Sequence, residues 1–145
     1  MPNADRHPVV VGVDGSISAE RAVVWAANEA RRRGLPLRLV HACPMVSTPS
    51  PAAVPRSFHE ALTELGAQWL GEAAGLALRV APDTDAYTDL VPGYAAEVLV
   101  QESRSASLIV LGSRGLGGFT GLVVGSVAVA LTAHGECPIV VVRGA

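Results

Sequence analysis

Three short runs of consecutive apolar residues, many of them β-branched, constrain the fold of this chain most strongly. They cover residues 9–13, 108–111 and 139–142, and none alternates between polar and apolar side chains. The first two runs suit strands that are buried on both faces, which is typical of a parallel sheet covered by helices. The chain is therefore predicted to fold as an α/β protein.

Helical periodicity fills the stretches between the strands. Alanine and valine recur at i, i+3 and i+4 from Ala19 to Ala30, after a capping serine at 16 or 18, and Gly34 ends this helix. The next helix is expected over 58–80. We expect the remaining strands at 37–42 and 84–90, and the remaining helices around 95–99 and over 126–133. This βαβαβαβαβ order implies parallel strands joined by right-handed crossovers. We expect one domain over 1–145, with a mobile proline-rich loop at about 44–56.

Composition excludes several functions. The net charge of −2 and the lack of a basic stripe argue against nucleic-acid binding, and no apolar segment reaches the ~20 residues that span a membrane. The N-terminus lacks an apolar signal segment, so we expect a cytoplasmic protein. All 11 basic residues are arginine, which excludes a Walker-type loop and Schiff-base catalysis. Cys43 and Cys137 are expected at opposite ends of the sheet, which predicts no disulfide between them.

A glycine-rich loop follows the buried strand at 108–111. Residues 112–126 contain six glycines, and Gly125 and Ser126 open the next apolar helix. Glycines let backbone N–H groups approach a phosphate closely, and a helix N-terminus favours an anion. Ligands of open α/β sheets bind at the carboxyl ends of the strands, where this loop is expected. The loop therefore predicts a phosphate-binding site.

The spacing of these glycines resembles a known pattern, G-x₂-G-x₉-G-[ST], at Gly112, Gly115, Gly125 and Ser126. Together with the segments at 10–16, 110–115 and 137–142, it resembles the nucleotide-binding branch of the universal stress protein family. The resemblance implies a doubly wound, Rossmann-like parallel sheet of five strands in the order 3-2-1-4-5, as in the adenine nucleotide alpha hydrolase-like folds. It also implies a regulatory protein of the stress response that binds ATP, with Mg²⁺ or Mn²⁺ mainly on the phosphate oxygens.

The resemblance also implies which residues hold the nucleotide. The adenine would lie against Gly12, Asp14 and Ala42. The remaining nucleotide-binding residues implied are Gly112, Ser113, Arg114, Gly115, Leu116, Gly117, Gly118, Gly125, Ser126 and Val127, the last three at the distal phosphates. Many relatives carry a second hydroxyl where this chain has Ala128, which removes one phosphate contact. Members commonly form homodimers through the last strand, here 139–143, whose apolar edge invites a partner.

Several interpretations stay open at this stage. Asp14 either contacts the nucleotide or forms an Asx turn before the helix. His41 either touches the base or is structural, and Arg114 either pairs with a phosphate or faces solvent. Alternatives to the regulatory function are a slow ATPase or autophosphorylating enzyme, with Ser126 or Ser113 as acceptor, and a dimerising module that binds cyclic AMP or no nucleotide. No catalytic constellation is evident in the sequence.

Overall fold

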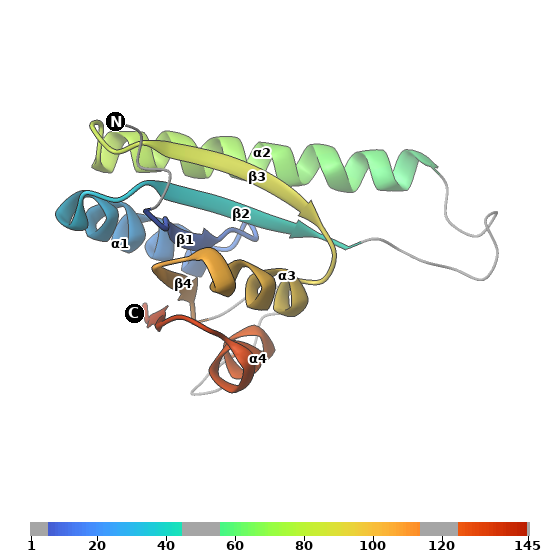
Figure 1. The fold of residues 1–145 in the computed structure, drawn as a ribbon. Helices are drawn as coiled ribbons and strands as arrows, with labels where there is room; N and C mark the ends of the chain where they lie inside the picture. The colour runs from blue at the N-terminus through green and yellow to red at the C-terminus, as the bar shows by residue number, and fades with distance from the viewer. Residues whose placement is uncertain (1–5, 45–55, 114–124, 145) are drawn as a thin grey trace.

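Five parallel strands form one sheet in the order β3-β2-β1-β4-β5 (Figure 1). The structure is a computed structural model that describes residues 6–44, 56–113 and 125–144. The strands are β1 (Val9–Gly12), β2 (Leu37–Cys43), β3 (Ala86–Pro92), β4 (Leu108–Gly112) and β5 (Ile139–Val142). The order reverses between β1 and β4, so the predicted doubly wound topology is confirmed.

Helix α1 (Ile17–Arg33) begins and ends where the sequence predicts. The hydroxyl of Ser16 accepts a hydrogen bond from the N–H of Ala19 at 3.1 Å, which caps the first turn. Gly34 ends the helix in the left-handed conformation, with φ at 65°. Arginines 31–33 lie in the last turn, where cations favour the helix dipole.

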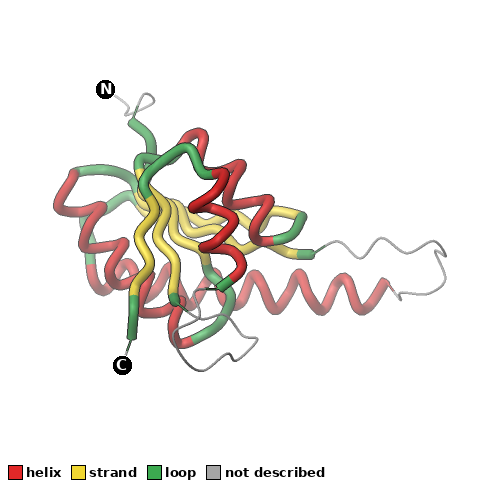
Figure 2. The backbone as a smooth tube through the Cα atoms, turned by 90° about the horizontal axis from the view of Figure 1, so that it is seen from below, coloured by secondary structure: helices red, strands yellow, loops and turns green. Residues whose placement is uncertain are grey.

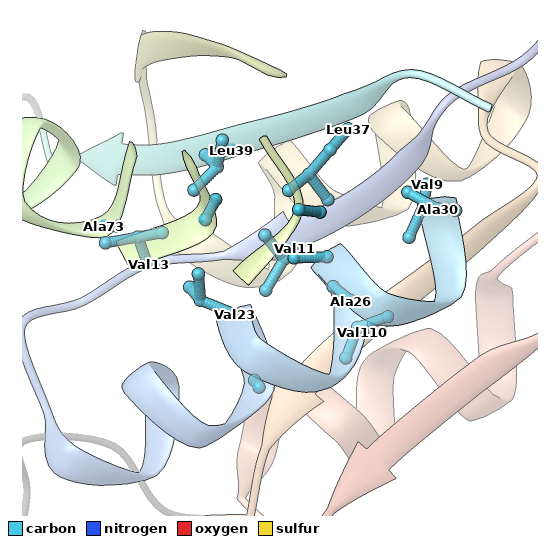
Figure 3. Close-up of a cluster of buried hydrophobic side chains, with 14 of the residues drawn as sticks. Val9, Val11, Val13, Val23, Ala26, Ala30, Leu37, Leu39, Ala73 and Val110 are labelled. Atoms are coloured by element: carbon cyan, nitrogen blue, oxygen red, sulfur yellow. The ribbon is translucent and has the colours of Figure 1, made fainter. Parts of the chain in front are cut away.

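The helices cover both faces of the sheet (Figure 2). Helices α1 and α2 (Arg56–Val80) pack on one face, over a core that includes Val9, Val11 and Leu39 (Figure 3). Helices α3 (Ala95–Glu102) and α4 (Ser126–His134) pack on the other, and a 3₁₀ turn at Ser103–Ser105 follows α3. The alternation of side chains along the central strands supplies both cores, which is why β1 and β4 carry no polar side chain.

The third strand lies two residues further along the chain than predicted. It was expected at 84–90 and spans Ala86–Pro92, because the N–H of Thr84 bonds to the carbonyl of Ala81 at 3.1 Å in a turn that follows α2. Strand β3 lies at a sheet edge, where Pro92 is tolerated although it lacks an N–H group. The predicted turn at Pro92–Gly93 begins inside the strand.

An ion network ties the outer strand to the sheet. The guanidinium of Arg38 on β2 donates to both carboxylate oxygens of Glu102 at 3.0 and 2.9 Å, and to Asp89 on β3 at 3.0 Å. The hydrogen bond to Glu102 is the main cause that raises the pKa of Arg38 above its ordinary value. This bidentate geometry links β2, β3 and the end of α3.

Both cysteines are thiols in the structure, so the prediction that they form no disulfide with each other is confirmed. Cys43 is buried at the carboxyl end of β2, and Cys137 is half-buried just before β5. Burial raises the pKa of the Cys137 thiol. Within the described ranges, no helix is both long enough and apolar enough to cross a bilayer.

Candidate functional site

Several predicted site residues come together at the carboxyl edge of the sheet. Gly12 ends β1, Gly112 ends β4, and Ala42 is the last residue but one of β2. Strands β1 and β4 are hydrogen-bonded neighbours at the point where the strand order reverses. In open α/β sheets this reversal opens the crevice in which ligands bind.

The chain leaves β1 through a tight turn at Asp14, Gly15 and Ser16. One carboxylate oxygen of Asp14, Oδ1, accepts hydrogen bonds from the backbone N–H of Ser16 at 2.9 Å and from its hydroxyl at 2.5 Å. Gly15 adopts a φ of 82°, which L-residues with a side chain rarely adopt. The Asx turn weighed for Asp14 is therefore present, and it orients the carboxylate at the edge of the sheet.

Gly112 is required by packing between β4 and α1. A Cβ atom on Gly112 would lie 2.6 Å from the backbone carbon of Ser18 and 2.7 Å from its oxygen. Because these are backbone atoms at the start of α1, they cannot move aside as a flexible side chain could. The absence of a side chain at Gly112 therefore lets α1 approach the end of β4.

Helix α4 begins at the same edge with an N-terminus that no side chain of the described residues caps. Gly125 is the N-cap residue, and the carbonyl of Gly125 accepts from the N–H of Val129 at 3.2 Å. The N–H groups of the first turn, which includes Ser126 and Val127, have no intrahelical acceptor. Among the described residues, a Cβ on Gly125 would meet nothing within 4 Å, so a side chain could be added at this position. Such an N-terminus attracts an anion through its N–H groups and dipole.

The middle of the glycine-rich loop lies outside the described residues. This part includes Arg114, Gly115, Leu116, Gly117 and Gly118. Residues 45–55 of the predicted mobile loop also lie outside the described residues. Ser113 is described, and its backbone N–H donates to the carbonyl of Val142 on β5 at 3.1 Å. This hydrogen bond continues the pairing of β4 with β5 and uses the N–H of Ser113. The hydroxyl and the carbonyl of Ser113 stay available for a ligand.

His41 is a structural residue of the core. Its side chain is 8% exposed, its Nδ1 lies 2.7 Å from the carbonyl oxygen of Val13, and its ring packs edge-on against Trp69 at 5.4 Å. Gly66 on α2 lets the ring approach, since a Cβ there would lie 2.5 Å from its Cδ2 atom. Of the two interpretations for His41, these contacts favour the structural one.

Sequence reasoning did not assign Trp69 a role at the edge. Its indole lies over Gly15, where an added Cβ would stand 2.6 Å from the Nε1 atom. Trp69 appears in the sequence only as one apolar position of α2. Its contact with the turn after β1 joins residues 54 positions apart and leaves no local signal.

Among the residues that the structure describes, no three histidine, cysteine or acidic side chains gather as ligands for a metal ion.

The sequence matches the model of the universal stress protein family over residues 5–143. Universal stress protein Rv2623 of Mycobacterium tuberculosis is 37% identical over 140 residues, which are 93% of this chain and 47% of the relative. Universal stress protein Rv2624c of the same organism is 38% identical over 136 residues, with the same shares covered. The chain thus spans about half the length of these relatives.

Solved structures show the same fold. A protein of the universal stress protein family from Burkholderia pseudomallei superposes with a TM-score of 0.76 at 27% identity, covering 99% of this chain and 100% of that one. A universal stress protein in complex with cAMP superposes with a TM-score of 0.70 at 25% identity, covering 96% and 99%. One from Archaeoglobus fulgidus in complex with dAMP gives 0.67 at 24% identity, covering 93% and 96%.

Proposed function

The chain belongs to the universal stress protein family, and from this premise we propose that it is a regulatory protein of the stress response that binds ATP. The observation that carries the proposal is the uncapped N-terminus of α4, which lies at the carboxyl edge where the strand order reverses. This is the arrangement that binds phosphate in open α/β folds. A structural relative in complex with cAMP supports an adenine nucleotide as the ligand.

The proposed nucleotide lies along the edge from β2 to α4. The adenine contacts Gly12, Asp14 and Ala42, the ribose and first phosphates contact the loop from Gly112 to Gly118, and the distal phosphates contact the first turn of α4 at 125–127. Gly12 and Gly112 end the neighbouring strands β1 and β4, so both lie at this edge. Mg²⁺ or Mn²⁺ would bridge phosphate oxygens and neutralise their charge.

Isothermal titration calorimetry with ATP, ADP, AMP and cyclic AMP tests this proposal. Gly125→Val places a side chain in front of the α4 amides, and the backbone angles there, φ −58° and ψ 158°, suit any L-residue. We expect this variant to weaken ATP binding at least tenfold. Gly71→Val is the matched control, because a Cβ there also meets nothing within 4 Å but the residue lies on the exposed side of α2.

The control should bind like the wild type, and circular dichroism should show both variants folded. If the wild type binds none of the four nucleotides, the proposed ligand class is wrong. If Gly125→Val binds as tightly as Gly71→Val, the phosphates do not lie at α4.

We further propose that one domain over 1–145 acts as a homodimer, paired through the edge strand β5 at 139–143. All four residues of β5 are apolar and only half-buried, and Val129 on the adjacent α4 is 59% exposed. Val142 accepts from Ser113, so the alternation along a parallel strand points the N–H of Val141 away from β4. An apolar edge with outward N–H groups invites a second strand.

Light scattering after gel filtration tests the dimer. Val141→Pro removes the outward N–H while keeping the bonds to β4, so we expect a monomer. Thr88→Pro makes the matched change at the opposite edge, on β3, and should leave the dimer intact. A wild-type monomer, or a Val141→Pro dimer, would contradict pairing through β5. The two thiols fit the reducing cytoplasm, where we propose that the protein acts.

A further inference from the structure

A hollow of about 190 Å³ lies between helices α1 and α2, beside the turn that follows β1. Small residues on the facing surfaces create it, among them Gly15, Ala19 and Ala73. An apolar cavity of roughly 150 Å³ accommodates a molecule the size of benzene. The hollow is therefore large enough for one small organic molecule.

The floor and one wall of this hollow are apolar. Val13, which follows β1, Val23 of α1 and Ala73 of α2 converge beneath it (Figure 3). All three are almost completely buried, with exposures of 6%, 1% and 8%. The indole of Trp69 forms the wall next to Gly15. A hydrocarbon group placed here would exchange water for this surface, which is favourable.

The rim carries charges of both signs that do not pair with each other. Glu20 of α1 and the α2 residues Glu72 and Arg79 line the hollow, and no ion pair joins them to one another or to another described residue. The neutral amide of Gln68 donates one hydrogen bond to the Glu72 carboxylate at 3.2 Å. Elsewhere on the same helices charges do pair, as Arg33 does with Glu29 at 2.7 Å.

The guanidinium on this rim reaches back toward the carboxylates. Nη1 of Arg79 lies 3.7 Å from the position of a Cβ on Gly75, one helical turn nearer to Glu72 along α2. The Arg79 guanidinium and the carboxylates of Glu20 and Glu72 thus line one apolar hollow. Each is available to a ligand group of opposite charge. A ligand with an ammonium, a carboxylate and an apolar body complements all three features.

We propose that this hollow binds a free apolar α-amino acid. Glu20 and Glu72 hold the ammonium, Arg79 holds the carboxylate, and the side chain lies on the valine floor against Trp69. The hollow adjoins the proposed nucleotide site at the turn after β1, where Gly15 and Ser16 line it next to Asp14, but its charged rim lies on the α1–α2 layer. Ala42, by contrast, packs against the core beneath α3 and α4.

Fluorescence of Trp69 tests the proposal in the full chain. Trp25→Phe removes the other tryptophan, so that Trp69 alone reports. Leucine, valine and phenylalanine are titrated as probes. 3-Methylbutylamine, which is leucine without its carboxylate, and 4-methylpentanoate, which lacks the ammonium, are the matched analogues. We expect a saturable signal with at least one amino acid and binding weaker by about tenfold or more for both leucine analogues, the loss typical of one charge-assisted hydrogen bond.

Variants of the rim residues test which side chain binds the carboxylate and which binds the ammonium of the amino acid. Arg79→Gln should weaken amino-acid binding about tenfold and leave the amine unaffected, whereas Glu72→Gln should weaken both. Arg56→Gln, at the exposed start of α2, is the control and should change neither. No saturable signal with any of the three amino acids would overturn the proposal, and so would equal affinity for leucine and its amine. Unchanged binding in Gly125→Val shows that the signal does not come from the proposed nucleotide site.

Discussion

Replacement of Gly15 by alanine tests whether the turn after β1 is held by Trp69. The change has two costs. Gly15 has a φ of 82°, and a side chain in this left-handed region costs about 1–2 kcal/mol. The new Cβ would also stand 2.6 Å from Nε1 and 2.7 Å from Cδ2 of the indole, and such overpacking costs about 1–3 kcal/mol.

Gly34→Ala separates these two costs. Gly34 also has a positive φ, 65°, but a Cβ there meets only the flexible end of Arg6 at 3.4 Å. We expect Gly34→Ala to lower the free energy of unfolding by about 1–2 kcal/mol and Gly15→Ala by about 2–5 kcal/mol. Gly15→Ala should then lower the melting temperature by roughly 5–15 °C.

Urea denaturation of both variants, followed by circular dichroism, measures the difference. Each variant is repeated with Trp69→Ala, which removes the indole. In that background the cost of Gly15→Ala should fall to that of Gly34→Ala, because only the backbone strain is left. Equal costs for the two glycine variants in the wild-type background would refute the reasoning, since the indole would then not constrain the turn.

Three further predictions follow from packing and charge. Gly112→Ala should cost about 1–3 kcal/mol of stability through its clash with the start of α1, whereas Gly125→Ala, which meets no atom, should cost under about 1 kcal/mol in the same thermal melts. Hydrogen bonds from Arg32 and Arg33 lower the pKa of Glu29. The stability that this exposed cluster contributes to the fold is therefore present at neutral pH and is lost as the pH falls through the lowered pKa. Glu29→Gln should therefore cost about 0.5 kcal/mol at pH 7 and nothing in strong acid, and a cost that does not change with pH would contradict this assignment. Burial raises the pKa of Cys137, so its alkylation at pH 8 should be slower than that of free cysteine. In the denatured chain, a thiol assay should detect two reactive thiols per chain, one for each cysteine.

The strands formed by uninterrupted apolar runs could be predicted from the sequence almost to the residue. Strand β5 spans Ile139–Val142 as expected, and β4 is longer by one residue. In these strands every position is apolar, so each strand begins where the apolar run begins and ends within one residue of where the run ends. Strand β3 lies at an edge with most side chains exposed or half-buried, so its pattern is weak and the prediction missed its position by two residues.

Contacts between distant parts of the chain could not be predicted in this way. The bond between His41 and Val13 spans 28 residues, and the packing of Gly112 against Ser18 spans 94. A periodic pattern reports which face of one element is buried, but it does not report which partner covers that face. The hollow between α1 and α2 was missed for the same reason, because it exists only where small residues of two helices face each other.

The glycine pattern illustrates what a motif can and cannot assign. The sequence pattern predicts the same role for its first and last glycines, Gly112 and Gly125, which is to expose backbone N–H groups to a phosphate. In the structure Gly112 has α1 backbone against it, while a Cβ on Gly125, at the N-terminus of α4, would meet none of the described residues. A side chain at Gly112 therefore disturbs the sheet and α1 together, so loss of binding there would not identify a ligand contact. A side chain at Gly125 leaves the packing intact, and so loss of nucleotide binding on its substitution reports on the site itself.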